Sequence, residues 1–96
     1  MAEAEVEVRN PSGLHARPAA TFVRAAGGFA ADVRVTNLSR DPGKTASAKS
    51  VLGVMGLGVA RGHRIRLVAD GTDADAAVAG LVELVAAGLG EELEPG

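Results

Sequence analysis

The feature of this sequence that most constrains its fold is a repeated change between two hydrophobic periods. In several short segments apolar and polar residues alternate, so that the apolar side chains fall on one face of an extended chain. Val33 and Val35 alternate with polar neighbours, and Ile65 and Leu67 alternate with arginines. The predicted strands cover residues 3–9, 32–36, 44–49 and 63–69. Each strand therefore has one apolar face that another layer must cover.

The segments between these strands follow a helical period instead. The predicted helices cover residues 16–26, 50–57 and 72–89. Gly27 and Gly28 predict a left-handed cap at the end of the first helix, and Thr72 is placed to cap the start of the last one. The resulting order is strand, helix, strand, strand, short helix, strand, helix. It predicts an α+β fold of two layers, in which helices cover the apolar face of a sheet.

The composition excludes several classes of function. The chain has 96 residues, 47% of them hydrophobic, which indicates one folded domain. A net charge of −2 and 2% aromatic residues give no reason to expect nucleic-acid binding. Cysteine is absent, which excludes disulfides, thiolate metal ligands and a thiol nucleophile. No apolar run approaches the ~20 residues of a membrane helix, and the acidic N-terminus does not resemble a signal peptide.

We therefore expect a cytoplasmic monomer that binds no metal or cofactor and does not insert into a membrane. We place the folded domain at residues 1–90 and an acidic, flexible tail at residues 91–96, which end in Pro-Gly.

The chemistry is expected in residues 10–20, which read Asn-Pro-Ser-Gly-Leu-His-Ala-Arg-Pro-Ala-Ala. Turn residues come first, and Pro18 suits the first turn of a helix, where its missing N–H is not needed. His15 is then expected at a helix N-terminus, where free N–H groups and the helix dipole favour anions. Arg17 adds a permanent positive charge nearby. An imidazole nucleophile beside an anion-binding helix end is the arrangement that a phosphorylatable histidine needs.

The segment Gly-Leu-His-Ala-Arg-Pro-Ala resembles the active-site motif of HPr, the histidine-containing phosphocarrier family of the sugar phosphotransferase system. The resemblance runs from Val6 to about Leu89. It implies an open-faced sandwich with an antiparallel four-stranded sheet. It also implies that His15 accepts a phosphoryl group on Nδ1 from Enzyme I, which phosphoenolpyruvate charges, and passes it to Enzyme IIA domains. Arg17 would stabilise the phosphate. Such a protein is a carrier with a phosphohistidine intermediate and not a stand-alone turnover enzyme.

A second segment, Lys-Ser-Val-Leu-Gly-Val-Met, resembles the region around the regulatory serine of HPr. Ser50 is expected to cap the short helix, and it is a candidate substrate of an HPr kinase/phosphorylase. Exposed apolar residues after Ser50 would form a docking patch for Enzyme I and Enzyme IIA, with contributions from the first helix. The candidate docking residues are Ala20, Arg24, Val51, Leu52 and Met55. The hairpin loop at 37–44 looks longer than is usual in the family.

Other readings of the sequence remain open. The chain could be an HPr-like carrier for a nitrogen-related or dihydroxyacetone-kinase branch, or a regulatory module that acts through phosphorylation of Ser50. A generic α+β interaction domain would leave the His-Ala-Arg-Pro arrangement unexplained. The other histidine, His63, is expected to be a surface residue without a metal.

Overall fold

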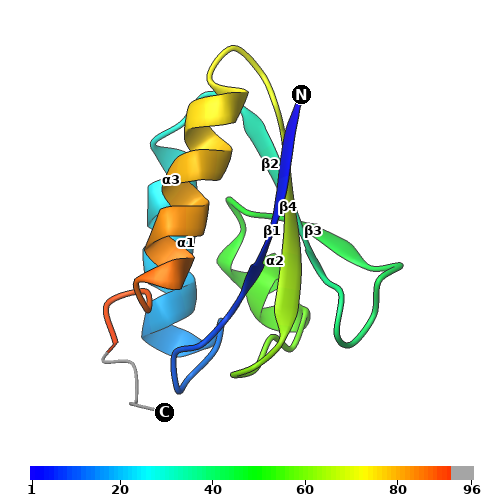
Figure 1. Ribbon diagram of the computed structural model, residues 1–96, viewed down its shortest axis with the longest axis vertical. Coiled ribbons are helices and arrows are strands. Elements are labelled where there is room, and N and C mark those ends of the chain that lie inside the picture. Colours follow the sequence, from blue (N-terminus) through cyan, green and yellow to red (C-terminus); the bar gives the residue numbers. More distant parts are fainter. Residues whose placement is uncertain (92–96) are drawn as a thin grey trace.

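Four strands form one antiparallel sheet in the order β1-β4-β2-β3 (Figure 1). The computed structural model describes residues 1–91. The strands are β1 (Ala2–Glu7), β2 (Asp32–Asn37), β3 (Thr45–Ser47) and β4 (Arg64–Asp70). In the central pairings Val6 lies opposite Ile65, and Val35 lies opposite Leu67. Residues directly opposite one another point to the same face of a sheet, so the predicted apolar faces coincide.

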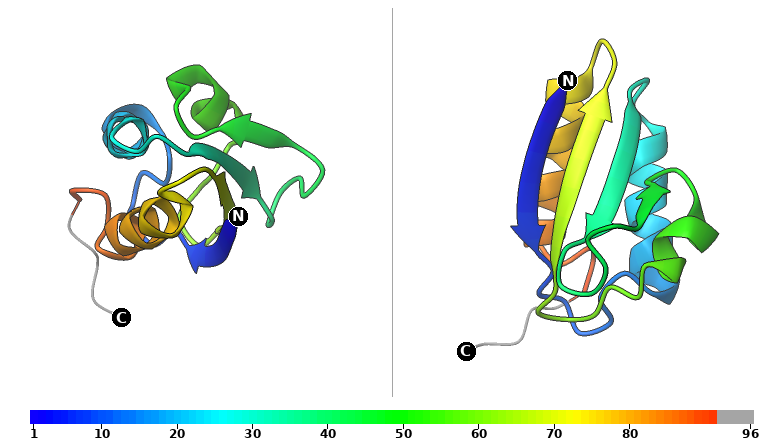
Figure 2. Two further views of the ribbon diagram at one scale, coloured as in Figure 1. Left: turned by 90° about the horizontal axis from the view of Figure 1, so that it is seen from above. Right: turned by 90° about the vertical axis from the view of Figure 1, so that its right-hand side faces the viewer.

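Two long helices cover that apolar face, and no helix of residues 1–91 lies on the other face (Figure 2). The helices are α1 (Ala16–Gly27), α2 (Val51–Gly56) and α3 (Ala74–Ala86). The short helix α2 packs against α1 and β3. The loop between β2 and β3 is the predicted hairpin loop, and Lys44 in this loop donates a hydrogen bond from Nζ to the carbonyl oxygen of Gly56 (3.2 Å). The predicted open-faced βαββαβα sandwich is confirmed.

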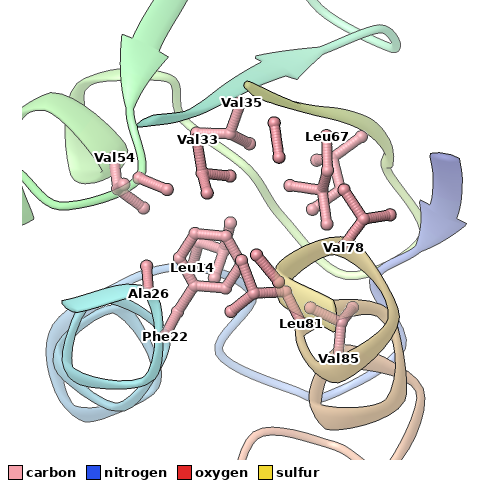
Figure 3. Close-up of a cluster of buried hydrophobic side chains, with 14 of the residues drawn as sticks. Leu14, Phe22, Ala26, Val33, Val35, Val54, Leu67, Val78, Leu81 and Val85 are labelled. Atoms are coloured by element: carbon pink, nitrogen blue, oxygen red, sulfur yellow. The ribbon is translucent and has the colours of Figure 1, made fainter. Parts of the chain in front are cut away.

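The core lies between the sheet and the helices and is almost entirely aliphatic. Phe22 from α1, Leu81 from α3 and Val33 and Leu67 from the sheet belong to one buried cluster, together with Leu14 (Figure 3). All of these side chains are at most 1% exposed. Burial of each large side chain contributes about 1.5–3 kcal/mol. The buried Leu14 matters for the site because it fixes the residue before His15 in the core.

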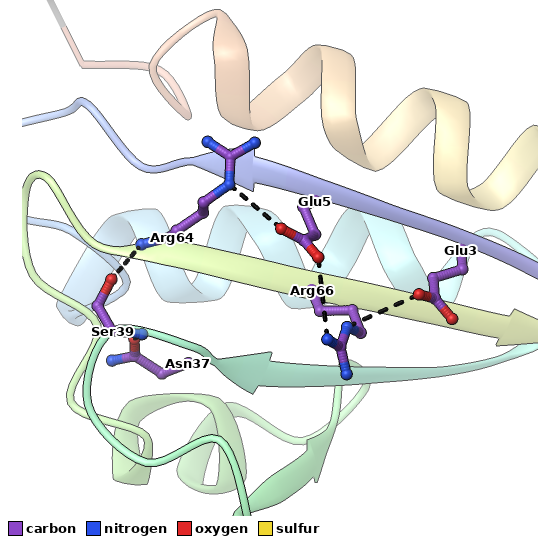
Figure 4. A network of polar contacts seen from close by, with 6 residues as sticks. All are labelled: Glu3, Glu5, Asn37, Ser39, Arg64 and Arg66. Atoms are coloured by element: carbon purple, nitrogen blue, oxygen red, sulfur yellow. Dashed lines mark hydrogen bonds and ion pairs between the residues drawn. The ribbon is translucent and has the colours of Figure 1, made fainter.

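The uncovered face of the sheet is occupied by paired charges (Figure 4). Arg64 Nε lies 3.3 Å from Glu5 Oε1, and Arg66 reaches Glu5 at 3.8 Å and Glu3 at 3.7 Å. These pairs are exposed to solvent, and such pairs typically contribute no more than about 1 kcal/mol each. Their presence explains why this face needs no covering layer.

The end of α1 and the start of α3 differ from the predictions. Gly28 caps α1 with an ordinary right-handed conformation (φ −77°), so the predicted left-handed cap of α1 is wrong. Thr72 does not begin α3; Asp73 is the N-cap residue. The Asp73 carboxylate makes no bond within its own helix and accepts hydrogen bonds from the N–H groups of Ala30 and Ala31, both at 2.8 Å.

A left-handed glycine cap does occur, but at the end of α3. Gly88 has φ 98° and donates to the carbonyl oxygen of Val85 (3.1 Å), while Leu89 donates to Leu84 (3.1 Å). These two bonds define a Schellman motif, in which the chain reverses directly after the helix. The helix therefore stops at Ala86, short of the predicted Leu89. Of the predicted tail, Glu91 belongs to the described chain, and residues 92–96 lie outside the described residues.

Candidate functional site

The turn before His15 is held in place from two sides. Within the turn, the buried Asn10 donates from Nδ2 to the carbonyl oxygen of Gly13 (2.9 Å), and Gly13 N–H donates back to Asn10 (3.1 Å). Across the turn, Leu14 N–H donates to the carbonyl oxygen of Val59 (3.0 Å). Gly13 has φ 60°, and a side chain there would collide with the backbone of Val59 and Ala60. The close approach of these two backbones therefore requires glycine.

His15 is the N-cap residue of α1 and is exposed. Its backbone is extended (φ −131°, ψ 150°), but its side chain makes no capping hydrogen bond. The first turn of α1 contains no acidic residue either, and Pro18 carries no N–H. Within residues 1–91, the free N–H groups of this helix end therefore have no side-chain acceptor, and an anion beside the imidazole could take that place.

Ala16, the residue between His15 and Arg17, has a left-handed backbone with φ 52°. For an alanine this conformation is unfavourable by about 1–2 kcal/mol, because Cβ comes too close to the following carbonyl oxygen. Backbone strain of this kind persists only where the surrounding structure imposes it. Here Leu14 on one side and the buried residues Pro18 and Ala19 on the other side impose it.

Arg17, in the first turn of α1, is exposed. Within residues 1–91 it makes no hydrogen bond or ion pair. Its planar guanidinium is therefore available to bind an anion through two parallel N–H groups.

Sequence reasoning missed one residue of this site, Glu91. Its carboxylate accepts hydrogen bonds from Asn10 Nδ2 (2.9 Å), Ser12 N–H (3.0 Å) and Ser12 Oγ (2.9 Å). These bonds hold the pKa of Glu91 below its ordinary value of 4.5, and the bond from Asn10 has the largest effect. The charge of Arg17 acts in the same direction. No local pattern could have indicated this contact, because Glu91 and the turn are about 80 residues apart in the chain.

The second predicted segment behaves as expected at its first residue. Ser50 is the N-cap of α2, and its Oγ accepts a hydrogen bond from Gly53 N–H (3.0 Å). After it, Leu52 is 83% exposed and Val51 39%, whereas Met55 is half-buried. On α1, the candidate docking residues are the half-buried Ala20 and the exposed Arg24. Since α1 and α2 are in contact, the two sets lie on neighbouring helices.

His63 is half-buried and hydrogen-bonded, so its assignment as a simple surface residue is wrong. Its Nδ1 accepts from Ala60 N–H (3.1 Å) and lies 3.0 Å from Asn37 Nδ2. The buried Asn37 also donates to the carbonyl oxygen of Leu57 (3.2 Å) and accepts from Ser39 N–H (3.1 Å). This cluster fixes the segment after α2, against which the turn before His15 packs.

Two further features concern ligands and membranes. Across residues 1–91, histidine and carboxylate side chains are nowhere gathered in threes around a possible metal position. In the same part of the chain, no helix has the length and apolar character needed to cross a bilayer.

An open-faced sandwich with an exposed histidine at an uncapped helix end has the form of a small phosphocarrier. A protein-family model described as "PTS HPr component phosphorylation site" matches residues 2–87. The chain belongs to this HPr family, the phosphocarriers of the phosphotransferase system.

Individual relatives agree with the family assignment. The chain is 47% identical over 88 residues to a multiphosphoryl transfer protein of Escherichia coli O157:H7, an alignment that covers 92% of this chain and 23% of that protein. The chain thus spans about a quarter of the length of these multiphosphoryl transfer proteins.

Among solved structures, HPr-C-His from Thermoanaerobacter tengcongensis is 43% identical with a TM-score of 0.89, over 97% of this chain and 100% of that one. The phosphocarrier protein HPr from Bacillus anthracis is 38% identical with a TM-score of 0.79, over 85% of this chain and 93% of that one. A structure described as an HPr dimer from Thermoanaerobacter tengcongensis is 41% identical with a TM-score of 0.72, over 95% of this chain and 100% of that one.

Proposed function

We propose that His15 is the phosphoryl acceptor, that Enzyme I charged by phosphoenolpyruvate is the donor, and that Enzyme IIA domains taking part in sugar uptake receive the group. The observation that carries this proposal is the exposed imidazole at the uncapped start of α1. One ring nitrogen attacks phosphorus in line while the bond from phosphorus to the donor breaks, and the acceptor repeats the same exchange. By family resemblance the attacking nitrogen is Nδ1.

The free N–H groups of α1 and the Arg17 guanidinium would stabilise the phosphoryl oxygens. The N–H groups are already in place before the phosphate arrives, because the turn is fixed by hydrogen bonds and α1 is anchored in the core. Preorganised donors of this kind act without rearrangement during the transfer. The exposed Arg17 side chain would turn onto the phosphate once it is present. The transfer therefore needs positioning and charge stabilisation, with no metal or cofactor supplied by this chain.

The exposed side chains of Val51 and Leu52, next to Met55, would form the patch that receives both partners. Arg24 and Ala20 on α1 would extend it. A phosphate on Ser50 would add charge to this patch and weaken docking without altering the chemistry at His15. We place this activity in the cytoplasm, with the protein acting as a monomer.

The test is incubation with phosphoenolpyruvate and Enzyme I. The wild type should acquire an acid-labile, base-stable phosphate, and His15→Ala should acquire none. Arg17→Ala should slow the transfer by about 10²-fold, since it removes one charge-stabilising donor. Arg24→Ala is the matched control, because it removes an exposed arginine of the same helix and should alter mainly KM. Failure of competent Enzyme I to phosphorylate the wild type would contradict the proposal.

A further inference from the structure

Glu91 reaches the active-site turn because of the way α3 ends. After the Schellman motif at Gly88, the buried Leu89 fixes the reversed chain in the core. Glu91 N–H then donates to the carbonyl oxygen of Gly88 (2.9 Å), which closes a second turn. The carboxylate is thereby carried from a rigid helix end to the loop before His15.

The carboxylate is the partner of donors that would otherwise have none within residues 1–91. Ser12 donates its N–H to Glu91 Oε1 (3.0 Å) and its Oγ to Oε2 (2.9 Å), and neither group makes another bond in this part of the chain. Asn10 uses its amide nitrogen twice, once for Gly13 inside the turn and once for Glu91. One carboxylate therefore joins Asn10 and Ser12, the first and third residues of the turn before His15.

We propose that Glu91 is a positioning residue for phosphoryl transfer at His15, acting through the turn of residues 10–13. This inference rests on the proposed function of His15. Pro11 and Ser12 are exposed, so the outer side of the turn is not held by core packing. The three hydrogen bonds to Glu91, which we call the clamp, hold it instead. A small displacement of a reacting group strongly slows a transfer that relies on alignment. Three charge-assisted hydrogen bonds to a loop of four residues restrict such displacement.

The kinetic test compares Glu91→Gln with Glu83→Gln, which removes an exposed carboxylate from α3 itself. With Enzyme I in catalytic amounts, Glu91→Gln should lower kcat for phosphorylation of His15 about tenfold and leave KM nearly unchanged, because the docking patch is intact. Glu83→Gln should alter neither constant. Ser12→Ala, which removes one of the three bonds and keeps the carboxylate, should give an intermediate kcat.

A second measurement detects the hydrogen bonds between Glu91 and the turn directly, in the absence of phosphoryl transfer. In NMR spectra the Ser12 amide proton of the wild type should shift in acid as Glu91 becomes protonated, and this titration should be absent from Glu91→Gln. Circular dichroism checks that each variant is folded, and Glu91→Asp provides a shorter carboxylate that should restore part of kcat if Glu91→Gln is unstable.

The outcomes separate the two proposals. If the wild type accepts phosphate and Glu91→Gln matches Glu83→Gln in kcat, the role of Glu91 is overturned and the function of His15 stands. A Ser12 amide that ignores the titration of Glu91 would also overturn the clamp. If the wild type accepts no phosphate, the proposed function fails and the positioning role fails with it, even where the Ser12 titration shows the contact to exist.

Discussion

The N-cap residues of α1 and α2, His15 and Ser50, treat the start of their helices in opposite ways. Ser50 turns its Oγ back onto Gly53 N–H and so satisfies one free donor of α2. His15 occupies the same position in α1 with an extended backbone, but its side chain leaves the donors of α1 open. The capped start of α2 is the usual arrangement in proteins, whereas the uncapped start of α1 leaves its positive end available to a ligand.

The start of α3 is a third case that clarifies the other two. Asp73 stands at the N-cap position, yet its carboxylate binds the N–H groups of Ala30 and Ala31 in the loop after α1. A polar residue at a helix start can therefore serve its own helix, another segment or a ligand. We infer that the start of α1 is left free to bind a ligand, whereas the N-cap residues of α2 and α3 have structural roles. The following predictions test this difference between the helices.

The largest effect is expected for His15→Ser, which would turn the start of α1 into one like that of α2. Phosphorylation by Enzyme I should be lost completely. Folding should become more stable than in His15→Ala, by about 1 kcal/mol or less, because a serine at the N-cap satisfies a free donor. Urea denaturation of the two variants measures the difference. A serine variant no more stable than the alanine variant would show that the start of α1 cannot be capped.

The reverse change, Ser50→Ala, should destabilise the fold by about 1 kcal/mol and leave kcat for phosphorylation of His15 unchanged. Ser50→Gly is the control, since glycine at an N-cap loses only a few tenths of a kcal/mol relative to serine. Urea unfolding followed by circular dichroism gives the stabilities. A large loss of kcat in Ser50→Ala would contradict the separation of the two helix starts.

Ala16→Gly should stabilise the protein by up to about 1 kcal/mol, because glycine adopts φ 52° without the clash of Cβ. The control is Ala79→Gly, an exposed alanine within α3, where glycine should destabilise by about 1 kcal/mol. Opposite signs for the same substitution, measured by thermal unfolding, would establish the strain next to His15. Equal signs would mean that the site imposes no strain.

The smallest effect is expected for Asp73→Asn, and it depends on pH. Hydrogen bonds from the N–H groups of Ala30 and Ala31 lower the pKa of Asp73 below its ordinary value of 3.8, and the bond from Ala30 has the larger effect. A pKa that is lower in the folded than in the unfolded chain stabilises the fold fully above the ordinary value, and this stabilisation is lost as pH falls through the folded value. The variant should therefore have a Tm a few degrees lower at neutral pH, and the difference should shrink in acid below about pH 3.8. Asp75→Asn, in the same helical turn, should show a smaller difference, and equal differences would refute the role of Asp73.

The parts of the fold that could be predicted are those encoded by local periodicity. The alternation of Val33 and Val35, and of Ile65 and Leu67, correctly identified the buried face of the sheet. The turn before His15 and the cap at Ser50 were also predictable, because turn and cap residues act on their immediate neighbours. β3 is shorter than predicted, at Thr45–Ser47, in a segment with poor strand propensity.

The parts that could not be predicted depend on contacts between distant segments. Glu91 reads as one of several acidic residues near the end of the chain, and only the fold brings it to Ser12. Asp73 directly follows the predicted cap Thr72 in the sequence, and only packing against the loop after α1 brings its carboxylate to the N–H groups of Ala30 and Ala31. His63 and Asn37 are likewise joined by the pairing of β2 with β4.

The paired charges on the open face of the sheet affect how a partner first meets this protein. Because Glu3 and Glu5 lie beside Arg64 and Arg66, their fields largely cancel for a molecule approaching from that side. Arg17 and Arg24 make no ion pair within residues 1–91, so they keep their attraction for acidic surfaces. Productive collisions should therefore be favoured on the helical side, and the association rate should fall as added salt shortens the range of that attraction.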